Sequence, residues 1–313
     1  MKLLVVNSGS CYSTADVYNG YANAWRAQGH IVVDYALDRR LRAAKSWLQY
    51  QARHAGPGAQ KPTANDIVYF ASFEAFIKAL AHDVDWVVVV SCLMFHPGIF
   101  HAMRKSGLRC AVILTESPYY DELQLSWASL ANVTFTNERT SVTYFQPYCP
   151  ASYYLPHAYD PAKHKPEAPD EGVPAHDVVF VGTAWPERVE LLRAVNWDGV
   201  DFGLYGGFGR RSKRDPLRKH VRGGITDNGL TAALYRRAAI GLNLYRQAKT
   251  LEPASERVSG AESLNPRAVE LAACGCFTLS DVRPEVKEVF GELVPTFETA
   301  KELEELVRYY LAH

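Results

Sequence analysis

Residues 86–92 read Trp-Val-Val-Val-Val-Ser-Cys, the most strand-like run of the chain. Four β-branched residues in a row are apolar on both faces of a strand, which is typical of a parallel sheet covered by helices on both sides. A helical pattern follows at 97–106, closed by Gly107, and another apolar run begins at Arg109. This alternation of strand and helix predicts a doubly wound α/β domain.

The same alternation extends outward in both directions. Further strands are expected at 2–8, 31–37, 109–115, 133–136, 177–182, 201–205, 240–245 and 276–280. Helices are expected at 13–28, 73–81, 141–145, 186–195, 230–239, 266–274, 284–290 and 300–312. A segment rich in proline and charge, 160–175, interrupts the pattern and is interpreted as a linker. The sequence therefore predicts two Rossmann-like domains, 1–160 and 161–313, that face each other across a ligand-binding cleft.

The composition is that of an ordinary globular protein, with 48% hydrophobic and 22% charged residues among 313. The 34 basic residues equal the 34 acidic ones, so a polyanionic partner would have to bind a local patch. No run reaches the roughly 20 apolar residues of a membrane span, and the N-terminus lacks the pattern of a signal peptide. The six cysteines form no C-x-x-C pair. We therefore expect no transmembrane segment and a cytoplasmic location.

The most informative polar stretch is 261–275, Ala-Glu-Ser-Leu-Asn-Pro-Arg-Ala-Val-Glu-Leu-Ala-Ala-Cys-Gly. A polar loop leads through Asn265 to a helix with proline at its first position, and open N–H groups at a helix start suit a phosphate. Arg267 could pair with a diphosphate, and Glu270, one turn into the helix, could bind the vicinal hydroxyls of a ribose. Glu262 could face a sugar. A capped surface helix with two solvated glutamates explains the same residues equally well.

Two strand ends of the C-terminal half add further candidates on the donor side. Gly182 and Thr183 form a strand-end turn where backbone N–H groups can approach a phosphate, and Arg188 would add positive charge. Tyr205 and Gly206 end another strand, where glycine allows the close approach of a base or phosphate. Plain strand-to-helix turns are the alternative interpretation of both segments.

Candidates on the acceptor side follow the strands of the N-terminal half. His96 comes after the 86–92 strand, at the carboxyl edge where open α/β sheets bind ligands. Glu116 and Asp121 come after the next strand, and either carboxylate could orient or deprotonate an acceptor hydroxyl. Tyr119 lies between them and could stack on a sugar face. A bystander histidine is the alternative for His96.

The first strand ends in Asn7-Ser8-Gly9-Ser10, where Ser8 and Gly9 could contact a ligand through the backbone. The segment is too short for a G-x-G-x-x-G fingerprint, so nicotinamide or flavin binding is not indicated. The sequence contains no H-E-x-x-H motif and no zinc-type cluster of ligands. We therefore expect no metal site and a metal-independent reaction.

One strongly basic patch lies at 210–222, where Arg-Arg-Ser-Lys-Arg is followed by Arg218, Lys219 and Arg222. It could contact a donor diphosphate or a polyanionic acceptor such as DNA. The patch has no interleaved aromatic residues, so stacking on bases is not indicated. A solvated loop is the simpler interpretation.

Glu262 and Glu270 have the spacing of the E-x7-E motif of glycosyltransferase family 4 and its GT-B relatives, family 1 included. More closely, the chain resembles the CgeB-type (spore-maturation-like) glycosyltransferases from about Trp86 to the end. The segments that carry the resemblance are 115–119 (Thr-Glu-Ser-Pro-Tyr), 133–138 (Val-Thr-Phe-Thr-Asn-Glu), 154–161 (Tyr-Leu-Pro-His-Ala-Tyr-Asp-Pro), 179–183 (Val-Phe-Val-Gly-Thr) and 265–275.

The resemblance implies a GT-B fold, with a nucleoside diphosphate sugar bound by the C-terminal domain and an acceptor bound mainly by the N-terminal one. It places Glu270 on the donor ribose and Glu262 and His96 near the sugar, with retention at the anomeric carbon. A UDP-sugar is the first expectation for the co-substrate, and no other cofactor is expected. The Gly-rich loop usual after the first glutamate reads Ser-Leu-Asn-Pro-Arg at 263–267, so sugar specificity does not carry over.

The acceptor stays open among a glycan, a small molecule, a protein and a modified DNA base. A phage-type DNA glycosyltransferase using the 210–222 patch, a nucleotide-sugar epimerase and a non-catalytic small-ligand binder are the alternative functions.

Overall fold

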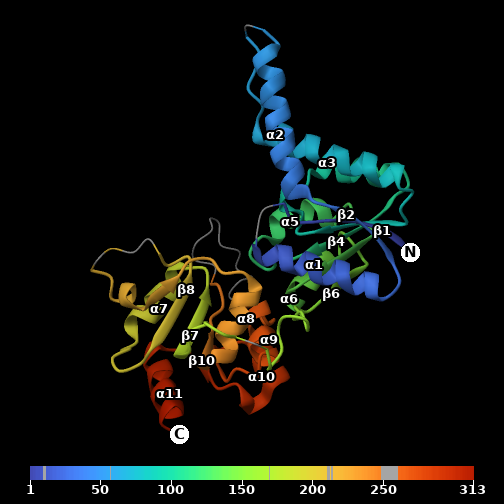
Figure 1. The fold of residues 1–313 in the computed structure, drawn as a ribbon. Helices are drawn as coiled ribbons and strands as arrows, with labels where there is room; N and C mark the ends of the chain where they lie inside the picture. The colour runs from blue at the N-terminus through green and yellow to red at the C-terminus, as the bar shows by residue number, and fades with distance from the viewer. Residues whose placement is uncertain (10–11, 57, 169, 210–211, 213, 248–259) are drawn as a thin grey trace. The chain divides into compact units, whose positions relative to one another are not determined.

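The computed structural model describes residues 1–313 apart from 10–11, 57, 169, 210–211, 213 and 248–259. The chain consists of two compact units, Met1–Leu155 and Pro156–His313 (Figure 1). The sequence placed the boundary slightly later, after residue 160. The five cysteines within the described residues are free and buried.

The N-terminal unit is built on a parallel sheet that has six strands among the described residues, in the order β2-β1-β3-β4-β5-β6. The strands are β1 (Lys2–Val6), β2 (Ile31–Tyr35), β3 (Trp86–Val90), β4 (Arg109–Leu114), β5 (Val133–Thr136) and β6 (Ser152–Tyr154). The helical segments are α1 (Tyr12–Ala27), α2 (Leu37–His54), α3 (Ala64–Ala81), η1 (Cys92–Met94), α4 (Pro97–Lys105), α5 (Asp121–Ala128) and α6 (Arg139–Phe145).

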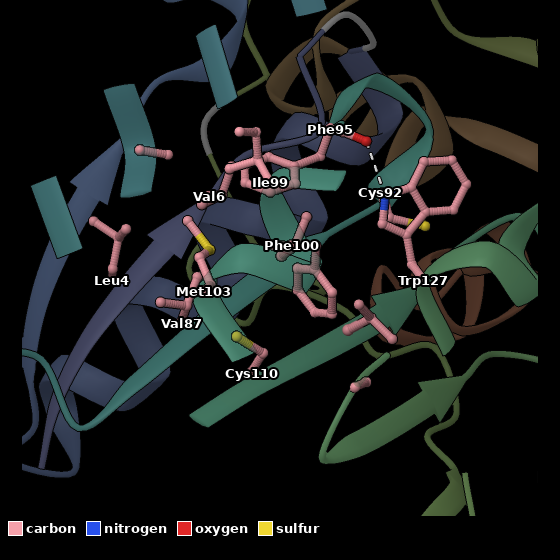
Figure 2. Close-up of a cluster of buried hydrophobic side chains, with 14 of the residues drawn as sticks. Leu4, Val6, Val87, Cys92, Phe95, Ile99, Phe100, Met103, Cys110 and Trp127 are labelled. Atoms are coloured by element: carbon pink, nitrogen blue, oxygen red, sulfur yellow. Dashed lines mark hydrogen bonds between the residues drawn. The ribbon is translucent and has the colours of Figure 1, made fainter. Parts of the chain in front are cut away.

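Both faces of this sheet are buried, as the apolar runs predict. Successive residues of β1 and β3 point to opposite sides, so Leu4 and Val87 join one core cluster while Leu3 and Val88 join the other. The larger cluster is closed by Phe95, Phe100, Met103 and Trp127 (Figure 2). The indole N–H of Trp127 donates to the carbonyl oxygen of Phe95 at 2.8 Å, which fixes α5 against the turn that follows β3.

The C-terminal unit repeats this design with a second parallel sheet, six-stranded within the described residues, in the order β12-β11-β10-β7-β8-β9. The strands are β7 (His176–Gly182), β8 (Phe202–Gly206), β9 (Val221–Gly223), β10 (Ala238–Asn243), β11 (Thr278–Asp281) and β12 (Thr296–Phe297). The helical segments are α7 (Pro186–Ala194), η2 (Pro216–His220), α8 (Asn228–Arg237), α9 (Pro266–Ala273), α10 (Pro284–Phe290), η5 (Gly291–Leu293) and α11 (Ala300–Ala312).

The segment interpreted as a linker packs against the C-terminal unit. The guanidinium of Arg236, from α8, forms two 2.7 Å bonds to the carboxylate of Asp170. It also donates to the carbonyl oxygens of Lys163 and Lys165, at 3.2 Å each. These contacts bury His164, which is 3% exposed. The segment is therefore a structural part of this unit.

Each sheet has a topological switch point, where the chain leaves a central strand first to one side and later to the other. In the N-terminal sheet this point lies between β1 and β3, and in the C-terminal sheet between β7 and β10. Ligands of open α/β sheets bind at the carboxyl ends of the strands that flank such a point. The two switch points are therefore the places to look for a site.

Candidate functional site

Arg267 lies at the switch point of the C-terminal sheet. It projects from the first turn of α9, and its Nε donates to the carbonyl oxygen of Val181 on β7 at 2.9 Å. Its Nη1 donates to the carbonyl oxygen of Leu244, just after β10, at 3.0 Å. The guanidinium carbon lies 4.7 Å from the ring centre of Phe180. One charged group is thus fixed between the carboxyl ends of the two strands.

Arg188 brings a second guanidinium to the same place from α7. Its side chain is buried, at 7% exposed, and Nη2 donates to the carbonyl oxygen of Leu244 at 2.7 Å. Its Nη1 donates to the carbonyl oxygen of Thr183 at 3.2 Å. Arg188 and Arg267 therefore share one carbonyl acceptor, which holds two positive charges side by side at this edge.

Asp281, at the end of β11, is a buried carboxyl group on which the charges of Arg188 and Arg267 act. Burial raises its pKa to about 6, although the backbone N–H of Tyr245 and the charges of Arg283, Arg188 and Arg267 act to lower it. The Tyr245 N–H donates to its two oxygens at 2.9 and 3.1 Å. The edge is thus a cluster of arginines grouped around one carboxyl group, an arrangement suited to an anionic ligand.

Two glycines allow the strand ends to pack this closely. A Cβ on Gly206 would lie 2.0 Å from the carbonyl oxygen of Gly182, and Gly206 has a positive φ of 109°. A Cβ on Gly182 would lie 2.5 Å from Nη2 of Arg267. Both residues were predicted to bring backbone close to a phosphate. In the structure they first make room for each other and for Arg267.

The start of α9 offers fewer open N–H groups than the sequence suggested. The Oδ1 of Asn265 caps the helix by accepting the N–H of Ala268 at 3.0 Å, and Pro266 has no N–H. Positive charge at this helix end therefore comes mainly from the side chain of Arg267.

Glu270 lies one turn further along α9, with its side chain 14% exposed. Its Oε1 is 4.0 Å from Nε2 of His164, a residue of the supposed linker. The Nδ1 of His164 accepts the backbone N–H of Asp160 at 3.1 Å, which places the proton of the neutral ring on Nε2, facing Glu270. Glu262 is half-buried in the loop before α9, and its carbonyl oxygen accepts the N–H of Glu285 at 3.1 Å.

The Tyr205 side chain does not lie at this edge. It is buried, and its hydroxyl is 2.9 Å from Nε2 of His176, at the start of β7. Nδ1 of that histidine is 2.9 Å from Asp201, just before β8, so the phenol belongs to a polar cluster at the amino ends of the strands. Gly203 makes this possible, since a Cβ there would lie 2.4 Å from the His176 ring. Thr183, in contrast, is exposed at the carboxyl edge.

At the switch point of the N-terminal sheet, Ser8 and Gly9 follow β1. Both are buried, and a Cβ on Gly9, whose φ is 82°, would lie 3.0 Å from Cβ of Met94 and 3.1 Å from Leu41. The space expected for a ligand at Gly9 is thus filled by side chains. Ser91, which follows β3, also has a positive φ, of 55°.

His96 caps α4 at the carboxyl edge of the same sheet. Its Nδ1 accepts the N–H of Gly98 at 3.1 Å, so the neutral ring carries its proton on Nε2 as a potential donor. The ring of Tyr69 packs edge-on against it, with centroids 5.1 Å apart. His96 is half-buried, which leaves part of the ring accessible.

Glu116 and Tyr119 lie between β4 and α5, whereas Asp121 is the first residue of α5, and the three differ in accessibility. Asp121 is 0% exposed and accepts the hydroxyl of Ser141 at 2.5 Å and the amide of Gln124 at 3.4 Å. That carboxylate joins α5 to α6 inside the unit and is not placed to touch an acceptor. Glu116 and Tyr119 are half-buried, and the carbonyl oxygen of Glu116 accepts the Tyr119 N–H at 2.9 Å.

Part of the basic patch is neutralised. Lys219 pairs with Asp198 at 3.1 Å and Arg222 with Asp201 at 3.0 Å. Arg210, Arg211 and Lys213 lie outside the described residues. No group of His, Cys, Asp or Glu side chains in the described part of the chain could hold a metal ion. None of the described helices is long and apolar enough to cross a membrane.

Sequence reasoning missed Arg246, Asp281 and Arg283 at the switch-point edge. The guanidinium carbon of Arg246 lies 4.2 Å from the ring centre of Trp185, and that of Arg283 lies 4.6 Å from the ring centre of Tyr245. Each of the three ends or follows β10 or β11 within a few residues. The carboxyl-edge rule that selected His96 could therefore have found them.

Known proteins resemble both the C-terminal half and the whole fold. Residues 167–313 match the family model Glyco_trans_1_2, described as Glycosyl transferase-like. No curated protein matches the sequence.

Several solved structures share the fold over the whole chain. An alpha-glucosyltransferase in complex with UDP and a 13-mer DNA has a TM-score of 0.62 at 14% identity, covering 100% of this chain and 90% of its own. A putative UDP-N-acetylglucosamine 2-epimerase from Listeria monocytogenes has a TM-score of 0.57 at 10% identity, with 100% and 88% covered. A trehalose-6-phosphate synthase, studied for glycosyltransfer with retention, has a TM-score of 0.56 at 12% identity, with 99% and 90% covered.

These likenesses confirm the predicted α/β fold, two Rossmann-like sheets of the GT-B type. The family match places a glycosyltransferase-like domain over most of the C-terminal unit, where the arginines gather. The family match supports a glycosyltransferase enzyme, and the solved structures show that the chain has the GT-B fold.

Proposed function

We propose that the protein transfers a hexose-like group from a nucleoside diphosphate sugar to an acceptor hydroxyl, with the donor bound at the β7–β10 switch point. One observation carries the proposal: Arg188 and Arg267 share the Leu244 carbonyl at that edge, and Glu270 lies one turn deeper on α9. Fixed cations beside a carboxylate suit a ligand that has a diphosphate next to a ribose.

The leaving group sets the main physical problem of the reaction. The bond between the anomeric carbon and the β-phosphate oxygen breaks, and its electron pair stays on the diphosphate. Preorganised guanidiniums stabilise that growing charge without having to reorient. Arg267 is held by backbone carbonyls on two strands, so its geometry is fixed before the donor arrives. This electrostatic support is why we propose a metal-independent reaction.

In this proposal Glu270 accepts the hydroxyl hydrogens of the ribose, and Glu262 contacts the sugar. His164 supports the first role, because its Nε2 proton faces Glu270 Oε1 at 4.0 Å and helps to position the carboxylate. UDP is the first nucleotide to test because the alpha-glucosyltransferase of the same fold was solved with UDP. Membership of the CgeB-type branch is proposed on the motif resemblance described above.

The acceptor is proposed to bind at the carboxyl edge of the N-terminal sheet. Glu116, Tyr119 and His96 remain the candidates there, since Asp121 is buried and the space at Gly9 is filled. We propose retention at the anomeric carbon because of the E-x7-E spacing of Glu262 and Glu270. A trehalose-6-phosphate synthase of the same fold, which was studied for glycosyltransfer with retention, supports this proposal. With retention, the acceptor proton can pass directly to the departing phosphate oxygen. Glu116 is then not needed as a base, and we propose that it orients the acceptor hydroxyl.

A thermal-shift panel tests the proposal, using UDP, GDP, TDP, ADP and CMP with their sugar conjugates, with and without Mg²⁺. Ligand at a hundredfold excess over its dissociation constant adds roughly 2.7 kcal/mol of stability. We expect one nucleotide to stabilise the wild type and to lose most of this effect in Glu270→Ala. Donor isomerisation without an acceptor would indicate an epimerase instead, and nucleotide binding without turnover on any acceptor would indicate a binding protein. No shift with any nucleotide would refute the donor site.

A further inference from the structure

Helix α3 has apolar side chains on its outer face as well as its inner one. Its small residues Ala71, Ala75 and Ala79 are fully buried against the sheet. Its opposite face exposes a stripe of large apolar side chains at intervals of four, four and three residues, which share one side of a helix. The α3 stripe consists of Tyr69 (47% exposed), Phe73 (40%), Ile77 (48%) and Leu80 (49%).

The neighbouring helix α2 is strongly basic and bears exposed aromatic rings. It contains five Arg or Lys side chains and one aspartate. Four of the five, Arg39, Arg40, Lys45 and Arg53, form no ion pair with a residue that the structure describes. Trp47 and Tyr50 are 50% and 51% exposed and stack with centroids 6.0 Å apart. In Figure 1, α2 extends well beyond the sheet.

A hollow of about 320 Å³ lies where α2 and α3 meet the end of β2. Arg39, Arg40 and Lys78 line it, and the Lys78 ammonium donates to the carbonyl oxygen of Asp34 at 3.0 Å. The Asp34 carboxylate is already engaged by Arg26 and by the Tyr18 hydroxyl. Three cations thus line the hollow beside Tyr35, two alanines and the already paired Asp34, and the hollow has room for a phosphate group.

We propose that the α2–α3 face binds an anionic lipid bilayer. Apolar and aromatic side chains beside basic ones are the composition of helices that lie in a membrane interface, where rings enter the headgroup region and cations bind lipid phosphates. A nucleic acid would give the cations a partner but none to Phe73, Ile77 and Leu80. A second copy of this chain, paired symmetrically through α3, would bring two basic α2 helices together. The bilayer satisfies both the apolar and the charged features.

The placement of the α3 stripe gives this binding a consequence for the reaction. Tyr69, its first residue, packs edge-on against His96 at the carboxyl edge of the sheet. A bilayer bound along α3 would hold that edge at the membrane surface, where the hydroxyl of a lipid-linked acceptor is presented. This consequence rests on the proposed function, whereas the lipid binding does not.

The test is co-sedimentation of the full chain with vesicles of phosphatidylcholine alone and of equimolar phosphatidylcholine and phosphatidylglycerol. We expect stronger binding to the mixed vesicles, weakened by salt. The double variant Phe73→Ser/Ile77→Ser should bind at least about tenfold more weakly, because two large side chains no longer leave water. Arg39→Gln/Arg53→Gln should lose only the preference for anionic vesicles. Circular dichroism and a thermal melt of each variant check that it is folded. If the double variant Phe73→Ser/Ile77→Ser is unfolded, the single variant Ile77→Ser takes its place in the vesicle assay.

The matched control is Val289→Ser/Leu293→Ser, which removes two apolar side chains that are 57% and 82% exposed in the C-terminal unit. It should bind vesicles as the wild type does. Absence of wild-type binding to mixed vesicles would overturn the proposal, as would an equal loss in this control. Two other results, each found together with no vesicle binding, would likewise overturn it. One is a wild-type dimer that dissociates in Phe73→Ser/Ile77→Ser, and the other is duplex DNA binding that is lost in Arg39→Gln/Arg53→Gln. Nucleotide binding, measured separately, reports on the donor site whatever the vesicles show.

Discussion

Replacing Gly182 by alanine should displace Arg267 without removing its charge. The new Cβ would lie 2.5 Å from Nη2 of Arg267 and 3.0 Å from Phe180 Cζ. An ordinary contact needs about 3.5 Å, so the guanidinium must retreat by about 1 Å. The glycine has no positive φ, so the change adds no backbone strain. The effect is thus purely a steric one on a fixed arginine.

The expected loss in the free energy of unfolding follows from the two hydrogen bonds that hold the guanidinium of Arg267. They join it to the carbonyl oxygens of Val181 and Leu244 at 2.9 and 3.0 Å. A retreat of about 1 Å takes at least one of them beyond hydrogen-bonding distance. A hydrogen bond from a charged donor contributes about 1.5–3 kcal/mol, and the Gly→Ala change restores about 0.4–1 kcal/mol through the unfolded chain. We expect a net loss of about 1–2 kcal/mol in the free energy of unfolding.

If the same amount, about 1–2 kcal/mol, is lost from the contact with the diphosphate, UDP binding should weaken roughly fivefold to thirtyfold, since about 1.4 kcal/mol corresponds to a factor of ten. Urea unfolding and isothermal titration with UDP measure the two effects. Gly209→Ala is the control, because a Cβ there meets nothing within 4 Å. It should leave both quantities near the wild-type values. An unchanged stability in Gly182→Ala would refute the geometry, and a stability loss with unchanged UDP affinity would refute the role of Arg267 in donor binding.

Four further changes probe the same account. Gly206→Ala should destabilise the protein more than Gly182→Ala, by about 3 kcal/mol or more in urea unfolding, because its Cβ would lie 2.0 Å from a backbone oxygen at a positive φ. Asp281→Asn should be more stable than the wild type at pH 7.5 by about 3 kcal/mol, the free energy that corresponds to the raised pKa of the buried carboxyl. That difference should shrink as the pH falls through about 6 and vanish near about pH 4, the ordinary pKa of the unfolded carboxyl, because the raised pKa makes the folded wild type gain protons and stability on acidification. Asp121→Asn should lower the melting temperature, through about 1–3 kcal/mol of mispaired hydrogen bonds, and leave the turnover of the folded enzyme intact. Glu116→Gln should leave stability unchanged and lower kcat/KM about tenfold, whereas a loss of a hundredfold or more in kcat would show that it is a general base and that the enzyme inverts.

The central strands β1, β3, β4 and β7 were predictable because their apolar runs are buried on both faces. The strand predicted at 133–136 has the same bounds in the structure, and those at 86–92 and 177–182 differ by one or two residues at an end. Helix α3 was predicted from residue 73, yet it begins at Ala64, where Thr63 and Asp66 form a capping box. That signature is readable in the sequence. The amphipathic helix α2 was missed, although Leu37, Leu41 and Ala44 recur at helical spacing.

The site was less predictable, because side-chain direction depends on contacts distant in sequence. Arg188 and Arg267 were correctly singled out, but nothing local shows that both donate to the Leu244 carbonyl. Tyr205 follows the carboxyl-edge rule by position, and only its bond to His176 reveals that its hydroxyl lies at the other end of the sheet. His164 had no sequence signal at all, since its burial depends on the contacts that Arg236 makes with the linker.

The most direct test of the central claim is a crystal structure of the protein with UDP bound. We expect the diphosphate at the carboxyl ends of β7 and β10, within hydrogen-bonding distance of Arg267, and the ribose hydroxyls on Glu270. A nucleotide bound elsewhere would contradict it, whether in the cavity of about 400 Å³ lined by Arg193, Phe208 and Arg214 or against the N-terminal sheet.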